Sequence, residues 1–315
     1  MKKLKTISKL LLLTTTLLVI ALFIYGTINQ HQYNRKVEQS DKSNKLFSQL
    51  DNHKIHYNLI GNGKYTFILQ SGLGTDIKTW DKIKDSLAKI GRVFTYERSG
   101  LGFSEETKQL KTTEQITAEL HKVIENENIK GPYILIGHSF GGVFTRYYAH
   151  RYPEEIAGIF LIDPSHEKMT YYFESYSMYF KLNGFIKSNL AWSGLPQFIL
   201  PNRSNSNYKT SKNIRNDARE KLAIQASMQQ MKDANILLTT LPMHIISTST
   251  KGTINDKKDS AIMEAIIGRS KRTISKHVSY NKPHNIHITN PEIVLKEFYD
   301  FFGKINSEPS SHTIN

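Results

Sequence analysis

The sequence contains no cysteine, which excludes disulfide bonds and metal sites built on thiolates. Acidic residues are scarce: 28 Asp and Glu stand against 42 Lys and Arg, so the formal net charge is +14. This balance is compatible with nucleic acid, an anionic membrane surface or an anionic cell wall as the partner. The lysines are scattered and no zinc-finger or RNA-binding signature is present, so we expect no nucleic acid.

Charge is absent from residues 10–26, a run of 17 residues. A membrane-spanning helix needs about 20 apolar residues, with about 17 as the lower limit, and the core of a signal peptide is usually about 7–15 residues long. Lysines and no acid precede the run, and the exit IYGTINQHQ lacks a good small-x-small cleavage site. We therefore predict an uncleaved signal anchor over residues 1–26, which holds the rest of the chain outside the cytoplasm. The alternative is a cleaved signal peptide and a secreted protein.

Beyond the anchor, short apolar runs alternate with helical patterns. We expect a polar linker over residues 27–52, a domain over 53–303 and a flexible tail over 304–315. Strands are predicted at residues 55–60, 65–70, 92–96, 133–137, 156–162, 243–248 and 277–280, and helices at 76–90, 113–126, 140–151, 260–269 and 292–302. The alternation predicts an α/β fold with a mostly parallel central sheet and helices on both faces.

The alternation is interrupted from about residue 165 to 240, where the chain is helical in character. This predicted insertion is rich in aromatic residues: Tyr171, Tyr172, Phe173, Tyr176, Tyr179, Phe180, Phe185 and Trp192. If the insertion covers the site, these rings would form an apolar, partly closed pocket. They could equally pack the insertion against the body, because aromatic residues also dominate cores.

A serine stands between two glycines in Gly137-His138-Ser139-Phe140-Gly141, where a predicted strand meets a predicted helix. A Gly-x-Ser-x-Gly sequence in this context is typical of a nucleophile elbow, a sharp turn that exposes the serine hydroxyl. Glycine and serine are also common in ordinary turns, so the five residues alone could be a chance match. The strand before and the helix after favour the elbow.

Four stretches together resemble the α/β-hydrolase fold family, in its branch with a helical cap. They are Gln70-Ser71-Gly72-Leu73-Gly74, Tyr96 to Ser104, the serine turn, and Pro283-His284-Asn285-Ile286-His287 followed by Pro291-Glu292. The resemblance spans about residues 54–302. Ser71 replaces the family's usual histidine of the oxyanion loop, and Glu97 replaces the usual aspartate of the second turn.

The resemblance implies a serine hydrolase. Ser139 would be the nucleophile and His284 the base, with His287 as the alternative base, and the backbone N–H groups of Leu73 and Phe140 would form the oxyanion hole. A serine hydroxyl needs such a base within hydrogen-bond reach, and a carboxylate must fix the tautomer of the histidine.

Two aspartates can supply that carboxylate. Asp163 ends the apolar strand 156–162, at the sheet edge where the site would be built. It could instead cap an Asp-Pro turn with Pro164. Asp256 comes late after the strand 243–248 and reads as a loop residue or a helix cap. We predict Asp163 as the acid and keep Asp256 as the alternative.

The sequence thus predicts hydrolysis of a carboxylic ester or a related acyl bond in a small-molecule substrate. It predicts no cofactor and no metal, since no His-Glu-x-x-His pattern is present. An aminopeptidase, a thioesterase or an acyltransferase would fit the same residues, whereas the family's dehalogenases use aspartate where Ser139 stands. A non-catalytic binding protein tethered to the cell surface is the alternative from another class, because fold does not prove chemistry.

Overall fold

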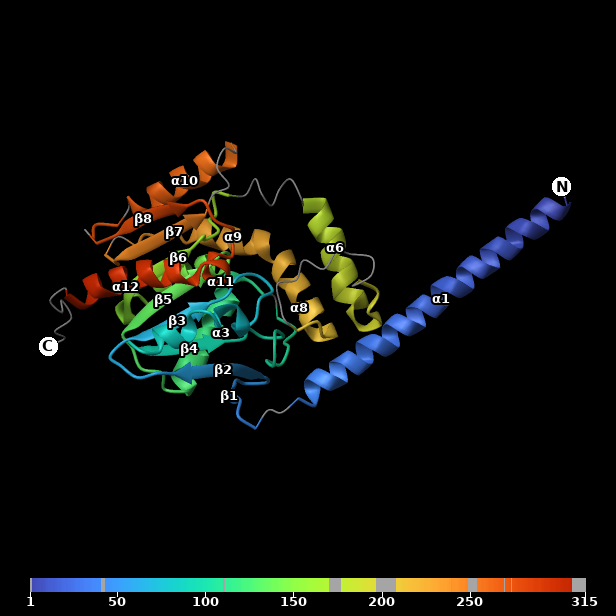
Figure 1. Ribbon diagram of the computed structural model, residues 1–315, viewed down its shortest axis with the longest axis horizontal. Coiled ribbons are helices and arrows are strands. Elements are labelled where there is room, and N and C mark those ends of the chain that lie inside the picture. Colours follow the sequence, from blue (N-terminus) through green and yellow to red (C-terminus); the bar gives the residue numbers. More distant parts are fainter. Residues whose placement is uncertain are drawn as a thin grey trace.

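The computed structural model describes residues 2–40, 43–109, 111–169, 177–196, 208–238, 240–248, 254–268, 270–272 and 274–307. Within these ranges, one eight-stranded sheet has the order β1-β2-β4-β3-β5-β6-β7-β8 (Figure 1). The strands are β1 (Leu46–Gln49), β2 (Lys54–Ile60), β3 (Thr66–Gln70), β4 (Arg92–Tyr96), β5 (Tyr133–His138), β6 (Ile156–Ile162), β7 (Met243–Thr248) and β8 (Lys276–Tyr280). Pairing is antiparallel at β1–β2 and β2–β4 and parallel from β4 to β8.

The central strands are buried on both faces, which explains their continuous apolar runs. Every residue of β3 and β5 is buried. One face packs against α3 (Thr113–Asn126), α4 (Gly141–Arg151), α9 (Ile224–Asp233) and α10 (Ile254–Ile267), and the other against α2 (Lys84–Leu87), α11 (Ile286–Thr289) and α12 (Pro291–Ser307). This arrangement confirms the predicted fold class.

A helical insertion separates β6 from β7. Its described helices are α6 (Ser177–Leu190), the 3-10 turn η3 (Ala191–Ser193) and α8 (Ser211–Leu222). We call α6, η3 and α8 the cap. The next helix, α9, returns to the body, because Met228 and Met231 join the core beneath α3. The predicted cap therefore exists. Of its aromatic residues, Tyr171, Tyr172, Phe173 and Tyr176 and the side chains of Tyr179 and Phe180 lie outside the described part.

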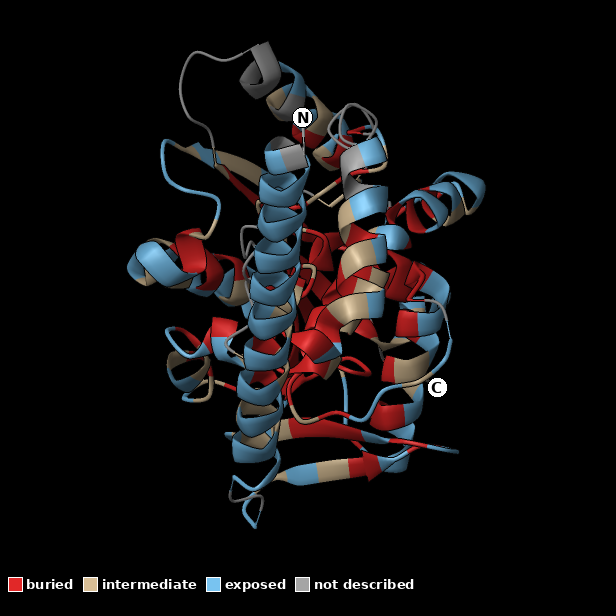
Figure 2. Cartoon of the chain, turned by 90° about the vertical axis from the view of Figure 1, so that its right-hand side faces the viewer, coloured by how far each residue is buried: buried red, intermediate tan, exposed pale blue. Residues whose placement is uncertain are grey.

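The first helix, α1 (Lys2–Glu38), projects from the body and is exposed along most of its length (Figures 1 and 2). It is long and apolar enough to cross a membrane. The prediction of a polar linker over residues 27–52 is wrong, because α1 continues to Glu38 and β1 begins at Leu46. Contacts with the cap hold the polar last turns of α1, and pairing with β2 holds β1. Neither contact can be predicted from the sequence pattern of residues 27–52.

Two smaller predictions also need correction. The helix expected over residues 76–90 is divided into a 3-10 turn, η1 (Ile77–Trp80), and the short α2. Its apolar side chains Trp80, Ile83 and Leu87 are nevertheless buried on one face of the sheet, as a helical stripe would be. The last helix, α12, extends to Ser307, so the start of the expected tail is helical; residues 308–315 lie outside the described part.

Candidate active site

Ser139 occupies the turn between β5 and α4 with a backbone φ of 53°. A left-handed conformation is strained for a serine and persists only where the surroundings enforce it. Here the Ser139 N–H donates to the Ile162 carbonyl at 3.0 Å, and the Ser139 carbonyl accepts from the N–H groups of Gly142 and Ser165. The turn is thereby fixed to the ends of β6 and α4.

The two glycines around Ser139 stand where no side chain fits. A Cβ on Gly137 would lie 2.4 Å from Thr145 Oγ1, and one on Gly141 would lie 2.1 Å from the Gln70 carbonyl oxygen. Contacts under about 3 Å force atoms to move, and the second is with backbone. Glycine at both positions therefore lets the turn pass between β3 and α4.

Asp163 follows β6 and contacts His284 directly. His284 Nδ1 donates to Asp163 Oδ2 at 2.5 Å. The same carboxylate accepts from the Thr248 N–H at 2.8 Å and from Thr248 Oγ1 at 2.5 Å, at the end of β7. Three donors thus orient the carboxylate, and the carboxylate orients the ring.

His284 remains accessible from solvent, since 51% of its side chain is exposed. Ser139 is partly exposed, and its Oγ makes no hydrogen bond within the part of the chain that the structure describes. Catalytic hydrogen bonds are often long in unliganded sites and tighten when substrate binds. The arrangement leaves both groups accessible to a reactant.

The glycine loop after β3 lies against the serine. A Cβ on Gly72 would lie 3.2 Å from Ser139 Cβ, so the loop backbone approaches the serine as closely as a glycine allows. Leu73, the next residue, is only partly buried. Ser71, at the position where histidine was expected, accepts a hydrogen bond from Trp80 Nε1 at 2.8 Å. Phe140 begins the turn into α4 on the other side of Ser139.

A buried ion pair between Arg98 and Glu220 fixes this loop. Arg98 donates to the carbonyls of Ser71 and Gly72 at 2.9 and 2.7 Å, and it pairs with both oxygens of Glu220 at 2.6 and 2.9 Å. Glu220 also accepts from the Gly74 N–H at 2.8 Å. Because Glu220 belongs to α8, the cap and the glycine loop are joined by charge-assisted hydrogen bonds.

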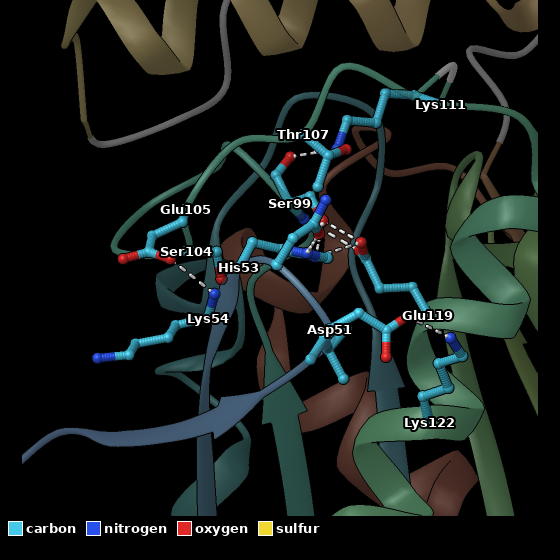
Figure 3. A network of polar contacts seen from close by, with 12 residues as sticks. Asp51, His53, Lys54, Ser99, Ser104, Glu105, Thr107, Lys111, Glu119 and Lys122 are labelled. Carbon is cyan, nitrogen blue, oxygen red and sulfur yellow. Dashed lines mark hydrogen bonds and ion pairs between the residues drawn. The ribbon is translucent and has the colours of Figure 1, made fainter.

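The turn that carries Arg98 rests on a polar network (Figure 3). Glu119 accepts from His53 and Ser99, and Lys111 donates to the Ser99 carbonyl at 2.7 Å. Burial alone would raise the pKa of Glu119, but its hydrogen bond from His53 and the charge of Lys111 outweigh burial and hold that pKa below its usual range. The network does not have the arrangement of a catalytic triad, because one nitrogen, His53 Nε2, contacts both Ser99 and Glu119 and Ser99 is fully buried.

Glu97 holds the turn Tyr96 to Ser104 together. Its carboxylate accepts from the Phe103 N–H at 2.5 Å and lies 2.8 Å from His56 Nδ1. Gly102 gives it room, since a Cβ there would lie 1.9 Å from the carboxylate. The longer side chain is thus accommodated within the turn.

His138 and His287 flank His284 from the buried side. Burial, together with the neighbouring histidines, lowers the pKa of His287 to about 3 and lowers that of His138 well below its usual value, so both rings are neutral. His138 lies 3.1 Å from the His284 carbonyl, and His287 lies 2.9 Å from Thr79 Oγ1. Of the two candidate bases, the structure therefore places His284, and not His287, against Asp163.

The alternative acid, Asp256, belongs to the first turn of α10, and its side chain lies outside the described part. No group of three His, Asp or Glu among the described residues could hold a metal. Sequence reasoning missed Thr248 and Glu220. Neither belongs to a motif, and their partners are distant in the chain, so only the fold could reveal them.

The sequence profile of the α/β-hydrolase fold matches residues 65–235. The chain belongs to the α/β-hydrolase fold family. The uncharacterized protein YqjL of Bacillus subtilis strain 168 is 24% identical over 242 residues, which is 76% of this chain and 84% of YqjL.

Solved structures of this fold superpose over most of the chain. The Cif epoxide hydrolase of Acinetobacter nosocomialis gives a TM-score of 0.65 at 16% identity, over 87% of this chain and 96% of its own. A bacterial membrane phospholipase A gives 0.59 at 18% identity, over 98% of this chain and 100% of its own. At such identities the likeness establishes the fold; the names of these two relatives are those of hydrolases.

Proposed function

We propose that the protein is a serine hydrolase that cleaves a carboxylic ester or a related acyl bond through Ser139, His284 and Asp163. The observation that carries the proposal is the hydrogen bond from His284 Nδ1 to the Asp163 carboxylate, close to a serine held in a strained turn. An aspartate on Nδ1 leaves Nε2 of the neutral ring unprotonated and able to accept the serine proton.

In the proposed reaction, Ser139 Oγ attacks the acyl carbon while its proton passes to His284 Nε2. Negative charge on the carbonyl oxygen would be stabilised by the backbone N–H groups of Leu73 and Phe140. The leaving alcohol takes the proton from His284, and an acyl-enzyme remains on Ser139. A water molecule then gives its proton to His284 and attacks the acyl carbon, which releases the acid and restores the serine.

The expected location is a membrane. We propose that α1 is an uncleaved anchor with the lysine-rich end in the cytoplasm and the hydrolase domain outside. The length of the apolar helix and the lysines that precede it support this orientation.

Ser139→Ala tests the proposed nucleophile. Turnover of short p-nitrophenyl esters should fall on the order of 10⁶-fold, as it does when a triad serine is removed. Ser86→Ala is the matched control, because Ser86 is a partly buried serine on α2 that is not part of the proposed site. A folded Ser139→Ala protein that keeps most of its turnover would overturn the assignment. No turnover by the unaltered protein on esters, thioesters or amino-acyl amides would favour a non-catalytic binding protein.

A further inference from the structure

The cap is attached to α1 at the level of its apolar segment. The rings of Phe23 and Trp192 meet edge to face with centroids 5.4 Å apart. Gly194 approaches the helix so closely that a Cβ there would lie 2.6 Å from the Gly26 carbonyl oxygen. The apolar part of α1 therefore contacts η3 and the glycine that follows it.

Polar contacts continue this interface toward the body. Gln30 Nε2 donates to the Lys209 carbonyl at 2.9 Å. Asn34 exchanges two hydrogen bonds with Ser211, one to its Oγ at 2.8 Å and one from its N–H at 2.9 Å. Lys209 precedes α8 and Ser211 is its first residue, so α1 and the start of α8 are joined at successive turns of α1.

The depth of this interface in a bilayer follows from the length of the membrane span. A span of about 20 residues that begins after Lys9 ends near Asn29, since the hydrocarbon core is about 30 Å thick and a helix rises about 1.5 Å per residue. Phe23 and Gly26 then lie inside the outer half of the bilayer. Because Trp192 and Gly194 touch them, η3 lies in the outer part of the bilayer, close to the interface where tryptophan is enriched.

The cap presents apolar side chains to solvent beside this interface. Met178, Leu182 and Phe185 of α6 and Trp192 of η3 are 79%, 59%, 65% and 49% exposed. The spacing of four and three residues puts Met178, Leu182 and Phe185 on one side of α6, and Trp192 follows in η3. We call these four residues the cap stripe. The cap lies on the same side of the body as α1 (Figures 1 and 2).

Charge in the cap suits an anionic lipid surface. The segment of α6 contains no acidic residue, and Lys181 on α6 and Lys209 before α8 are exposed. Each basic residue near an anionic membrane adds to the attraction. An apolar face with a basic fringe is typical of elements that lie in the interface plane of a bilayer.

We propose that the cap stripe inserts into the outer region of the lipid bilayer in which α1 is anchored. The substrate is then a membrane-dissolved amphiphilic ester, which reaches Ser139 from the lipid surface. This substrate class rests on the proposed function. The opposite side of α6 packs on α8, where a Cβ on Gly184 would lie 2.8 Å from Leu222. Since α8 carries Glu220, the membrane face of the cap is one helix away from the glycine loop of the site.

Intrinsic fluorescence tests the insertion without reference to catalysis. The protein has two tryptophans, and Trp80 is fully buried in the body while Trp192 belongs to the cap stripe. The full chain is reconstituted in phosphatidylcholine–phosphatidylglycerol vesicles whose upper acyl chains carry bromine, a contact quencher. We expect loss of most of the Trp192 emission, obtained as the difference between the protein and Trp192→Phe. Unquenched emission from protein that floats with the vesicles would overturn the proposal.

Activity tests the substrate class. Leu182→Ser with Phe185→Ser should lower the ratio of vesicle-ester turnover to short-ester turnover by roughly tenfold, because the two serines no longer gain free energy by leaving water for the lipid interface. Leu237→Ser is the matched control, since Leu237 is also 59% exposed but precedes β7 on the body. An unchanged ratio would overturn the substrate class.

The outcomes separate the two proposals. If the protein with intact Ser139 hydrolyses neither ester, the proposed function fails, and the quenching still reports on the cap. If the stripe is unquenched and the double variant dissociates an oligomer in light scattering, a second copy of the chain covers the stripe and the membrane proposal is wrong.

Discussion

Asp163 is held in the left-handed region at the end of β6, with φ 43°. Its carboxylate accepts from Thr248 and from His284, so it can fix the tautomer of the ring. We expect Asp163→Asn to lower kcat on the order of 10⁴-fold, as loss of the triad acid does. Steady-state turnover of a p-nitrophenyl ester measures the change. Asp256→Asn, the matched control, should leave kcat near the unaltered value, and the reverse pattern would make Asp256 the acid.

Glu220 is predicted to be a positioning residue. Glu220→Gln removes the charge that balances the buried Arg98, so the carbonyls and the N–H of the glycine loop lose their fixed partner. We expect kcat to fall on the order of 10²-fold with a smaller change in KM, since displacing a catalytic group by about 1 Å has such an effect.

Glu106→Gln is the control for Glu220. Glu106 of the body also forms an ion pair with the cap, through Arg215 of α8 at 2.7 Å. This pair is partly exposed, and exposed ion pairs contribute little to stability. Thermal melting of both variants separates loss of folding from loss of positioning. Equal reductions of kcat in the two variants would show that Glu220 only holds the cap on the body.

The placement of single residues was predictable where a motif or a strand end marks them. The glycines around Ser139 signalled the turn, and the position of Asp163 at the edge of the sheet was predictable because it ends an apolar strand. Thr248 and Glu220 were not, because a threonine at a strand end and a glutamate in a polar helix look ordinary in sequence. Their importance comes from contacts 85 and 146 residues away, with Asp163 and Gly74.

At the scale of elements, the turn from β5 to α4 depends on its glycines. Gly141→Ala places a Cβ 2.1 Å from the Gln70 carbonyl oxygen, and neither backbone can retreat easily. We expect a loss of about 1–3 kcal/mol in the free energy of unfolding, as for overpacked cores, together with reduced ester turnover. Denaturant unfolding measures it.

Gly303→Ala is the matched control, because a Cβ on Gly303 in α12 would meet no atom within 4 Å. In a helix interior, replacing glycine by alanine stabilises by about 1 kcal/mol. If Gly141→Ala were as stable as Gly303→Ala, the turn would have more freedom than the structure indicates.

Helices and strands were predictable where the apolar pattern of their own residues determines them. The buried strands β3 to β7 agree with their apolar runs to within a residue or two. The region 27–52 was not predictable, since its order comes from partners: the cap holds the end of α1, and β2 pairs with β1. For residues 76–90 the apolar pattern was also insufficient. A 3-10 turn followed by a short helix buries the same side chains that a continuous helix would bury.

The whole molecule is predicted to have its hydrolase domain outside the cytoplasm, anchored by α1. Protease added to intact spheroplasts should degrade the domain, because the lysines that precede the apolar segment stay inside. A domain protected from protease would reverse the orientation. A free domain in the medium that begins near residue 27 would mean that the segment is a cleaved signal peptide.

Covalent labelling of the full chain in membranes tests the central claim most directly. A fluorophosphonate reacts with a serine only when a base activates it, and peptide mass mapping then locates the phosphonyl group. The proposed mechanism predicts a single adduct on Ser139, no adduct in Ser139→Ala, and much slower labelling in Asp163→Asn. An unlabelled protein, or an adduct on another serine, would contradict the assignment of Ser139, His284 and Asp163 as a catalytic unit.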